Sequence, residues 1–299
     1  MPTPRHITLY TDFVKHHSWR WHWRSPVRNG VVFLLSLAAT RSTRRGAIRF
    51  TCYHHLFDDE RTAFARQLRC MRNYGEFIPL EEAVAMLRTQ TPIDGQYVCM
   101  TFDDGYKNCL SNALPILLDH GCKATFFIVS ELADAASCSL SDPDAVAAPH
   151  PAELMQRVLG FVCPEGESVE FLSWEECRLL QQEGMTIAPH TRSHRNLALL
   201  SANESRQEMV GSREDIHRHL GRFVPHLACP IGRPGLHFRP DVEPFLAQEA
   251  GFHSFFTLER GPNCLGTNPF RIKREHLCAG WGDYQIKYFF SRSCPGPPV

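Results

Sequence analysis

The sequence predicts an α/β fold built on parallel strands, and three of its features support this. Short apolar runs of strand-like composition alternate along the chain with segments whose apolar residues recur at helical spacing. Several helical segments stop just before a glycine, and two begin with an S-x-x-E sequence that is typical of helix starts. A chain of 299 residues can also bury the large core that such a sheet needs.

The first predicted strands and helices lie between residues 47 and 129. Residues 47–53 (AIRFTCY) alternate like a half-buried strand, and residues 124–129 (ATFFIV) form the continuous apolar run of a buried one. A third apolar run, at 97–102, is another buried strand. Apolar residues at helical spacing between these strands predict helices at 60–74, 79–87 and 110–120.

The second half continues the alternation after an insertion loop, which the Ala, Ser, Asp and Pro content predicts at 133–151. Capping boxes at 173–176 and 201–204 open two helices, which Gly184 and Gly221 close. The remaining predicted elements are a helix at 241–250 and strands at 185–189, 226–230 and 252–258. Strands that alternate with helices in this way favour a parallel sheet or a barrel.

The composition predicts a main α/β domain over residues 46–285 with an extension at each end. Residues 1–45 are basic and rich in aromatic residues, and residues 286–299 contain prolines that favour a disordered tail. The extension includes HHSWRWHWR at 16–24 and the apolar run VVFLLSLAA at 31–39, which we interpret as a short helix. The segment is interpreted as a solvated arm packed on its own domain, and the alternative is attachment to an anionic membrane surface, which tryptophans beside arginines would suit.

The sequence has no convincing export signal, so it predicts a cytoplasmic protein. Peripheral membrane contact through residues 1–45 is a second expectation. The apolar run at 31–39 is too short to span a bilayer, and its position does not fit a signal peptide. The 12 cysteines contain no C-x-x-C pair, which favours reduced, packed thiols over a disulfide framework or thiolate zinc sites. A formal net charge of zero argues against nucleic acid as a partner.

Two pairs of potential metal ligands follow predicted strands. Asp103 and Asp104 come directly after the strand at 97–102, and His190 and His194 come after the strand at 185–189. Ligands bind at the carboxyl ends of the strands in parallel α/β folds, so we expect these side chains to lie together. One carboxylate with two imidazoles is a sensible set for a catalytic divalent ion. The alternative is that no metal site exists. Asp103 and Asp104 would then be solvated in a turn, and the H-x-x-x-H spacing would be accidental in a chain with 16 histidines.

These residues belong to motifs that resemble the polysaccharide deacetylase family, also called the NodB-homology domain or carbohydrate esterase family 4. The matching stretches are TFDDGY (101–106), KATFFIV (123–129), HTRSH (190–194), CPIGR (229–233) and EAGFHSFFTLERG (249–261). The resemblance covers about Ala47 to Leu277. It implies a distorted (β/α) barrel with fewer than eight repeats and a metal-dependent de-N-acetylase.

The resemblance also implies roles for individual residues. Asp104, His190 and His194 would hold one divalent ion, with zinc as the expected metal. Asp103 would be the general base. The expected oxyanion and substrate contacts are the backbone N–H of Ile231, with Pro230 and Tyr106.

Two departures from the family pattern concern the third motif and the general acid. Many members carry an arginine where this chain has Ala228, and many end with a Leu-x-His motif of which no convincing copy occurs here. The branch that deacetylates exopolysaccharides and biofilm polymers takes its acid from an early Tyr-His element, which CYHH at 52–55 resembles. We therefore expect His54 to be the acid, with His55 and His276 as rivals. His276 follows the basic run RIKRE and is expected to be exposed.

The predicted function is metal-dependent hydrolysis of an N-acyl group, expected to be N-acetyl, from an amino sugar. The sugar would be part of a polysaccharide, an oligosaccharide or a lipid-linked glycan precursor. Two alternatives remain at this point. The same fold could serve as a non-catalytic carbohydrate-binding protein, or the enzyme could be a deformylase or another amide hydrolase.

Overall fold

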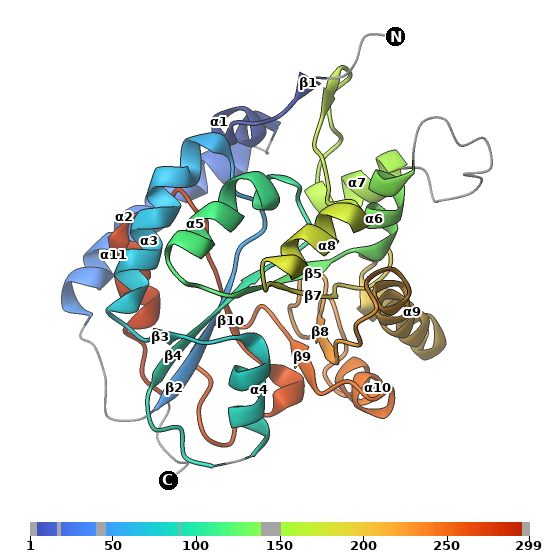
Figure 1. Ribbon diagram of the computed structural model, residues 1–299. Coiled ribbons are helices and arrows are strands. Elements are labelled where there is room, and N and C mark those ends of the chain that lie inside the picture. The colour runs from blue at the N-terminus through green and yellow to red at the C-terminus, as the bar shows by residue number, and fades with distance from the viewer. Residues whose placement is uncertain (1–4, 17–18, 40–45, 90, 139–150, 295–299) are drawn as a thin grey trace.

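Parallel strands form the centre of the fold, as the sequence predicts (Figure 1). The computed structural model describes residues 5–16, 19–39, 46–89, 91–138 and 151–294, with the backbone alone of 19–25 and 151. The strands are β1 (Arg5–His6), β2 (Ala47–Cys52), β3 (Glu76–Phe77), β4 (Gln96–Phe102), β5 (Ala124–Ile128), β6 (Glu167–Ser168), β7 (Thr186–Pro189), β8 (His226–Ala228), β9 (Ser254–Phe256) and β10 (Arg274–His276). The α-helices are α1 (Tyr10–Phe13), α2 (Trp19–Ala38), α3 (Arg61–Arg72), α4 (Leu80–Arg88), α5 (Leu114–Asp119), α6 (Ser130–Ser137), α7 (Pro151–Leu159), α8 (Trp174–Gln182), α9 (Ala202–Leu220), α10 (Glu243–Glu249) and α11 (Asp283–Phe290). Short helical turns are η1 (Val14–His16), η2 (Asp58–Glu60), η3 (Cys109–Ala113), η4 (Leu197–Leu199) and η5 (Pro269–Arg271).

The strands close into a distorted barrel. One parallel sheet has the order β10-β2-β4-β5-β7, with β3 beside β4, and β8 pairs with β9 in a second parallel ladder. Two links join the sheets. The ring of His190, just after β7, lies 2.8 Å from the Ala228 carbonyl of β8, and Phe256 of β9 forms a parallel bridge with Ile272. The predicted (β/α) barrel is therefore confirmed, with helices on the outside of the strands (Figure 1).

Alternate residues of each strand face opposite sides, so the barrel has an inner apolar layer and an outer one. The inner layer includes Ile48, Phe50, Cys99, Phe127, Ala188, Ala228 and Phe256. In the outer layer, the ring of Phe102 stacks between Tyr53 and Phe126, at centroid distances of 5.5 and 5.0 Å. This alternation decides which residues can reach the site at the strand ends.

The predicted elements of the main domain agree with the observed ones apart from small shifts at their ends. Both capping boxes are present, with the Ser173 and Ser201 hydroxyls accepting from backbone N–H groups at the starts of α8 and α9. Gly221 closes α9 in the left-handed region, at φ 68°. Only part of the predicted loop at 133–151 can be compared, because residues 139–150 lie outside the described part. Its first residues belong to α6, so the loop begins later than predicted.

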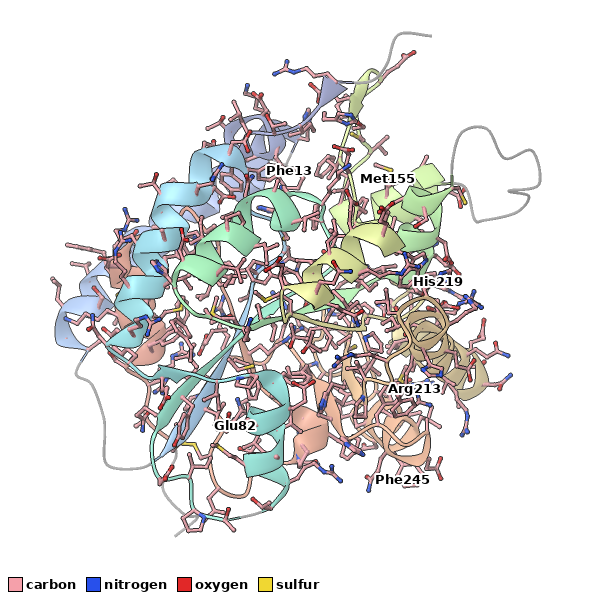
Figure 2. The ribbon with its side chains drawn as sticks, viewed as in Figure 1. Phe13, Glu82, Met155, Arg213, His219 and Phe245 are labelled. Carbon is pink, nitrogen blue, oxygen red and sulfur yellow. A yellow bond between two sulfur atoms is a disulfide. The ribbon has the colours of Figure 1, made fainter. Side chains whose placement is uncertain are left out.

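The N-terminal extension packs on the barrel. Phe13 is buried with its ring 5.0 Å from that of His55 and 5.4 Å from that of Phe161 (Figure 2). Helix α2 lies along α11, and it begins at Trp19 instead of near residue 31, where the short helix was predicted (Figure 1). Residues 17–18 of the tryptophan-rich segment lie outside the described residues. Among the helices that are described, none is long and apolar enough to cross a bilayer.

Helix α11 contradicts the prediction of a disordered tail from residue 286. Ile286, Phe289 and Phe290 are buried, and their spacing gives the helix an apolar stripe against α3 and α2. The prolines that suggested disorder lie after this helix. Residues 295–299 are outside the described part of the chain.

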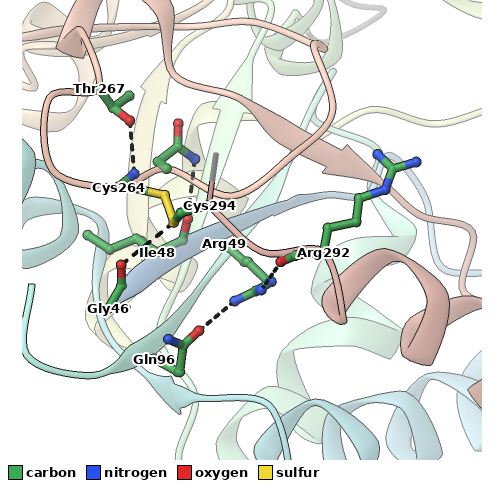
Figure 3. The surroundings of a disulfide bond; sticks show 9 residues. Gly46, Ile48, Arg49, Gln96, Cys264, Thr267, Arg292 and Cys294 are labelled. Atoms are coloured by element: carbon green, nitrogen blue, oxygen red, sulfur yellow. Dashed lines mark hydrogen bonds between the residues drawn. A yellow bond between two sulfur atoms is a disulfide. The ribbon is translucent and has the colours of Figure 1, made fainter. Parts of the chain in front are cut away.

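A disulfide joins Cys264 to Cys294, which departs from the expectation of reduced cysteines (Figure 3). The two residues are 30 positions apart and belong to no spacing motif, so their pairing could not be read from the sequence. Hydrogen bonds support the same contact. Arg49 of β2 donates to the Arg292 carbonyl at 2.6 Å and to the side chain of Gln96 at 2.9 Å. The disulfide and these bonds hold the residues after α11 against the start of the barrel.

Replacing Cys294 with Ser should lower the free energy of unfolding by about 3–4 kcal/mol under non-reducing conditions. This is the chain-entropy estimate for a loop of this length, because the cross-link restricts the unfolded chain. Urea unfolding of the purified protein measures it. The same change at Cys138, an exposed free cysteine, is the control and should leave the midpoint unchanged. Equal midpoints for the Cys294→Ser variant and the unaltered protein would contradict the prediction.

Candidate active site

Polar side chains take over from apolar ones where the inner side of the barrel reaches the strand ends. Every second side chain of β4, including Cys99, faces the inside of the barrel, and Asp103 is the next residue of this series beyond the strand. By the same alternation, His190 follows Ala188 of β7, and His54 follows the inward-facing residues of β2. Residues from three strands therefore converge at one end of the barrel, as expected for a parallel α/β fold.

Asp104, His190 and His194 form a compact buried group. The Nε2 atoms of His190 and His194 lie 3.4 and 3.3 Å from the same carboxylate oxygen, Asp104 Oδ1. All three residues are at most 4% exposed. Burial alone would raise the pKa of Asp104, but its contacts with the two imidazoles lower that pKa well below the usual range.

This group fits a divalent cation. Asp104 Oδ1 is buried and accepts no hydrogen bond from the described residues, although two imidazole nitrogens face it. The carbonyl of Ala228 can only accept, so His190 Nδ1 donates to it and His190 Nε2 is left with a lone pair that faces the site. Imidazole nitrogen and carboxylate oxygen are the donors of many catalytic zinc sites. The predicted ligands are thus brought together in a form that could hold a metal.

Backbone strain concentrates in the loops around this group. The non-glycine residues with positive φ in the described chain are Asp104 (72°), Thr191 (64°), His194 (53°) and Ile231 (57°). Such residues cost about 1–3 kcal/mol each and occur mainly at functional sites. Gly105 continues the turn at φ 83°, where a Cβ atom would lie 3.1 Å from the side chain of Ile128. The sharp turn after β4 therefore requires a glycine next to Asp104.

Helix α9 holds the loop that carries both histidines. The carboxylate of Glu208 accepts from the backbone N–H groups of Arg192 and Ser193 at 3.0 and 2.9 Å, and from the Ser193 hydroxyl at 2.5 Å. Within the loop, the Thr191 hydroxyl accepts from the N–H of His194 at 3.2 Å. These bonds fix the loop in its strained conformation.

Asp103 is paired with Arg274, a residue that the sequence motifs did not reveal. The guanidinium Nη1 and Nη2 donate to the two carboxylate oxygens at 2.6 and 2.7 Å, and the arginine is fully buried. Its Nε donates to the Thr257 carbonyl at 3.1 Å, and it lies 5.5 Å from the ring of Phe127. Arg274 comes from β10, so a cation reaches Asp103 although position 228, where the resemblance noted above implies an arginine, is alanine.

The surroundings of Asp103 keep it charged. Burial would raise the pKa of Asp103, but Arg274 and His190 outweigh this effect and lower it. The thiol of Cys52 donates to Asp103 Oδ2 at 3.2 Å, and burial raises the pKa of this thiol well above its usual value. Cys52, His54 and Asp103 form a second group that could hold a metal. Both oxygens of Asp103 already accept from Arg274, however, so a cation would meet a fixed positive charge there, and the Asp104 group is the better site.

The three candidate acids occupy different places. His54 lies on the inner side, and its imidazole and the carboxylate of Asp103 offer atoms within 4.8 Å of each other. The next residue, His55, points to the outer side, with its Nδ1 3.5 Å from Glu60 and its ring 4.6 Å from that of Phe57. His276 is not exposed, contrary to expectation. It is partly buried, with its ring 4.9 Å from that of His54.

The other predicted substrate residues divide into two groups. Pro230 and Ile231 follow β8, whose Ala228 carbonyl binds the His190 ring, and Ile231 is 43% exposed. A large apolar side chain at positive φ is unusual and fits a loop that faces a ligand. Tyr106, in contrast, is buried with its ring 5.0 Å from that of Phe171. Its ring supports the loop and is not presented to solvent.

Comparisons with known proteins agree with this geometry. The model of the family described as polysaccharide deacetylase matches residues 90–250, more than half of the chain. The chain belongs to the polysaccharide deacetylase family. Its match to YxkH of Bacillus subtilis (strain 168), whose name places it in the same family, is 23% identical over 163 residues. This match covers 54% of the chain and 45% of that protein, so it spans less than half of the relative's length.

Solved deacetylase structures share the fold of this family member. IcaB from Ammonifex degensii matches with a TM-score of 0.64 at 20% identity, over 85% of this chain and all of that chain (100%). The deacetylase PplD from Streptococcus pyogenes, solved with acetate, matches with a TM-score of 0.60 at 18% identity, over 84% and 99% of the two chains. Both likenesses show the NodB-type barrel.

Proposed function

We propose that this protein removes an N-acyl group, N-acetyl in the simplest case, from an amino sugar of a glycan in a metal-dependent reaction. The observation that carries the proposal is the buried Asp104, His190 and His194 group beside an arginine-bound carboxylate, Asp103. Membership of the polysaccharide deacetylase family supports the same class of reaction. We assign zinc to this group, because two imidazoles and one carboxylate are a common ligand set of catalytic zinc sites.

The division of labour between the two aspartates follows from their contacts. A divalent ion held by Asp104, His190 and His194 would supply Lewis acidity, lowering the pKa of a water toward about 7 and polarising the amide carbonyl. Asp103 lies next to the Asp104, His190 and His194 group but does not belong to it. Its carboxylate is therefore the one that can accept the proton of the attacking water. Arg274 holds both oxygens of Asp103 and thereby fixes the orientation of the base.

Hydrolysis of an amide also needs a proton for the leaving amine and a donor for the oxyanion. His54 is the imidazole that the strand alternation directs into the site, and we assign the proton transfer to it. Ile231 lies three residues past Ala228, whose carbonyl accepts from the His190 ring, and we assign its backbone N–H to the oxyanion.

Replacing His54 with Ala should lower kcat by about a hundredfold or more, the usual scale for lost general acid–base catalysis, with unchanged metal content. A matched control is His55→Phe, which keeps an aromatic ring among Phe13 and Phe57 and should retain most activity. The readouts are acyl release and metal analysis of the purified variants. A His54→Ala enzyme with near-normal kcat, together with an inactive His276→Ala enzyme, would transfer the role to His276.

Release of acetate or formate from a panel of N-acyl amino sugars tests the proposal as a whole. The panel includes free sugars, oligosaccharides and lipid-linked sugars, each assayed with added zinc and with a chelator. We expect zinc-dependent release of acetate. Metal binding without release from any member would favour the non-catalytic carbohydrate-binding alternative, and release of formate alone would make the enzyme a deformylase.

A further inference from the structure

The outward side of helix α2 is apolar, although it faces solvent. Its exposed residues, with their exposed fractions, are Val27 (67%), Val31 (52%), Leu34 (66%), Leu35 (47%) and Leu37 (65%). We call these five residues the outer face of α2. Val27, Val31 and Leu34 are spaced i, i+4 and i+7, so they form one stripe along the helix. Surface helices of globular proteins normally place charged or polar residues there.

The opposite side of α2 is already occupied by the barrel. Val32 and Ser36 are buried, the ring of Phe33 meets Tyr284 of α11 at 5.5 Å, and the guanidinium of Arg28 lies 5.2 Å over the ring of Trp281. Helix α2 is therefore anchored through one side. Its apolar outer face is left for a partner outside the described part of the chain.

The charge around α2 indicates the nature of that partner. Between residues 13 and 45 the chain has no Asp or Glu, and its basic residues are Lys15, Arg20, Arg24, Arg28, Arg41, Arg44 and Arg45. The whole chain has a formal net charge of zero, so this segment is a local concentration of positive charge. An apolar helix face combined with flanking arginines is the pattern of helices that lie in the headgroup region of anionic bilayers.

We propose that the outer face of α2 binds the surface of an anionic lipid bilayer. The main competitor is a second copy of this chain, packed through the same face. A two-fold pairing would bring the same basic segments of two copies together, and like charges at an interface disfavour association. An anionic bilayer satisfies both the apolar face and the charge.

The position of α2 relates this contact to the barrel. Helix α1, which precedes α2 in the chain, is fixed near the carboxyl ends of the strands, where the N–H groups of Tyr10 and Thr11 donate to Asp59, seven residues past the end of β2. Helix α2 then runs along the side of the barrel beside α11 (Figure 1). Bilayer contact would therefore hold the barrel with its side against the lipid and the start of α2 toward the end that carries the candidate active site.

Co-sedimentation of the full chain with vesicles tests the proposal. We expect binding to vesicles of phosphatidylglycerol and phosphatidylcholine, weaker binding to phosphatidylcholine alone, and loss of binding as salt screens the charges. Val31→Glu and Leu34→Glu should each reduce binding to the anionic vesicles about tenfold or more. The matched control is Phe245→Glu on α10, a 58% exposed apolar residue on another side of the molecule, which should bind like the unaltered protein (Figure 2).

Two further measurements make each outcome decisive. Circular dichroism melts verify that the variants fold, and Leu34→Ser replaces Leu34→Glu if the latter does not. Sedimentation velocity reports the oligomeric state. Equal vesicle binding by the unaltered protein and the α2 variants would overturn the proposal. If the unaltered protein is a dimer, the variants are monomers and vesicle binding is the same for all, the outer face of α2 is a dimer interface instead. Release of acetate from a soluble substrate should be the same in all variants, which separates this contact from the proposed chemistry.

Discussion

Replacing Asp103 with Asn should abolish turnover and leave the metal in place, whereas Asp104→Asn should weaken metal binding itself. The two carboxylates are adjacent in sequence but have different contacts. Asp104 Oδ1 faces the imidazoles of His190 and His194, and both oxygens of Asp103 accept from Arg274. Loss of the base should lower kcat by at least about a hundredfold.

Metal analysis and acyl release, measured on the same preparations, distinguish the two roles. The control is His194→Ala, which removes a different member of the same ligand group and should resemble Asp104→Asn in both assays. If the Asp103 and Asp104 variants lose metal and activity to the same extent, the division of roles between the carboxylates is wrong.

Replacing Arg274 with Met should destabilise the fold by about 3–5 kcal/mol, the usual cost of removing one partner from a buried ion pair. Methionine keeps most of the length of the side chain but leaves Asp103 as an uncompensated charge inside the barrel. Urea unfolding gives the change in free energy. The variant should also lose activity, because the base is no longer held.

A double variant tests the physical cause of this loss. In Arg274→Met combined with Asp103→Asn, the buried carboxylate is gone as well, so part of the stability should return. The matched surface control is Arg271→Met. The guanidinium of Arg271 pairs with Glu259 at 2.7 Å, but the side chain is about half exposed. Exposed ion pairs contribute little to the free energy of unfolding. Equal destabilisation by Arg271→Met and Arg274→Met would show that burial of the pair is not what matters.

The sequence predicted those parts of the site that depend on local order. Asp103, Asp104 and His190 follow strands that are recognisable from their apolar runs. The choice of His54 over His55 rested on the resemblance of CYHH to the Tyr-His element. Arg274 was missed because its strand is only three residues long and its sequence, RIKREH, reads as a solvated basic run. Nothing local reveals that this arginine points into the barrel.

The same limit explains the differences at the chain ends. The burial of Phe13 and the packing of α2 on α11 depend on contacts between residues that are far apart in sequence. The pairing of Cys264 with Cys294 depends on such a contact too. The expectation of a cytoplasmic location rested partly on reduced cysteines, and this disulfide removes that support, because disulfides persist mainly in oxidising compartments.

The residues with positive φ around the site affect how the protein unfolds on heating. Asp104, His194 and Ile231 store conformational energy that is released when their loops open, so these loops should open before the barrel unfolds. An ion that needs Asp104 and both histidines in place binds only the protein whose loops are not open. Because it stabilises that form, it would raise the melting temperature once its concentration exceeds its dissociation constant. A series of melting curves at increasing zinc concentration would therefore measure the affinity of the site without any substrate.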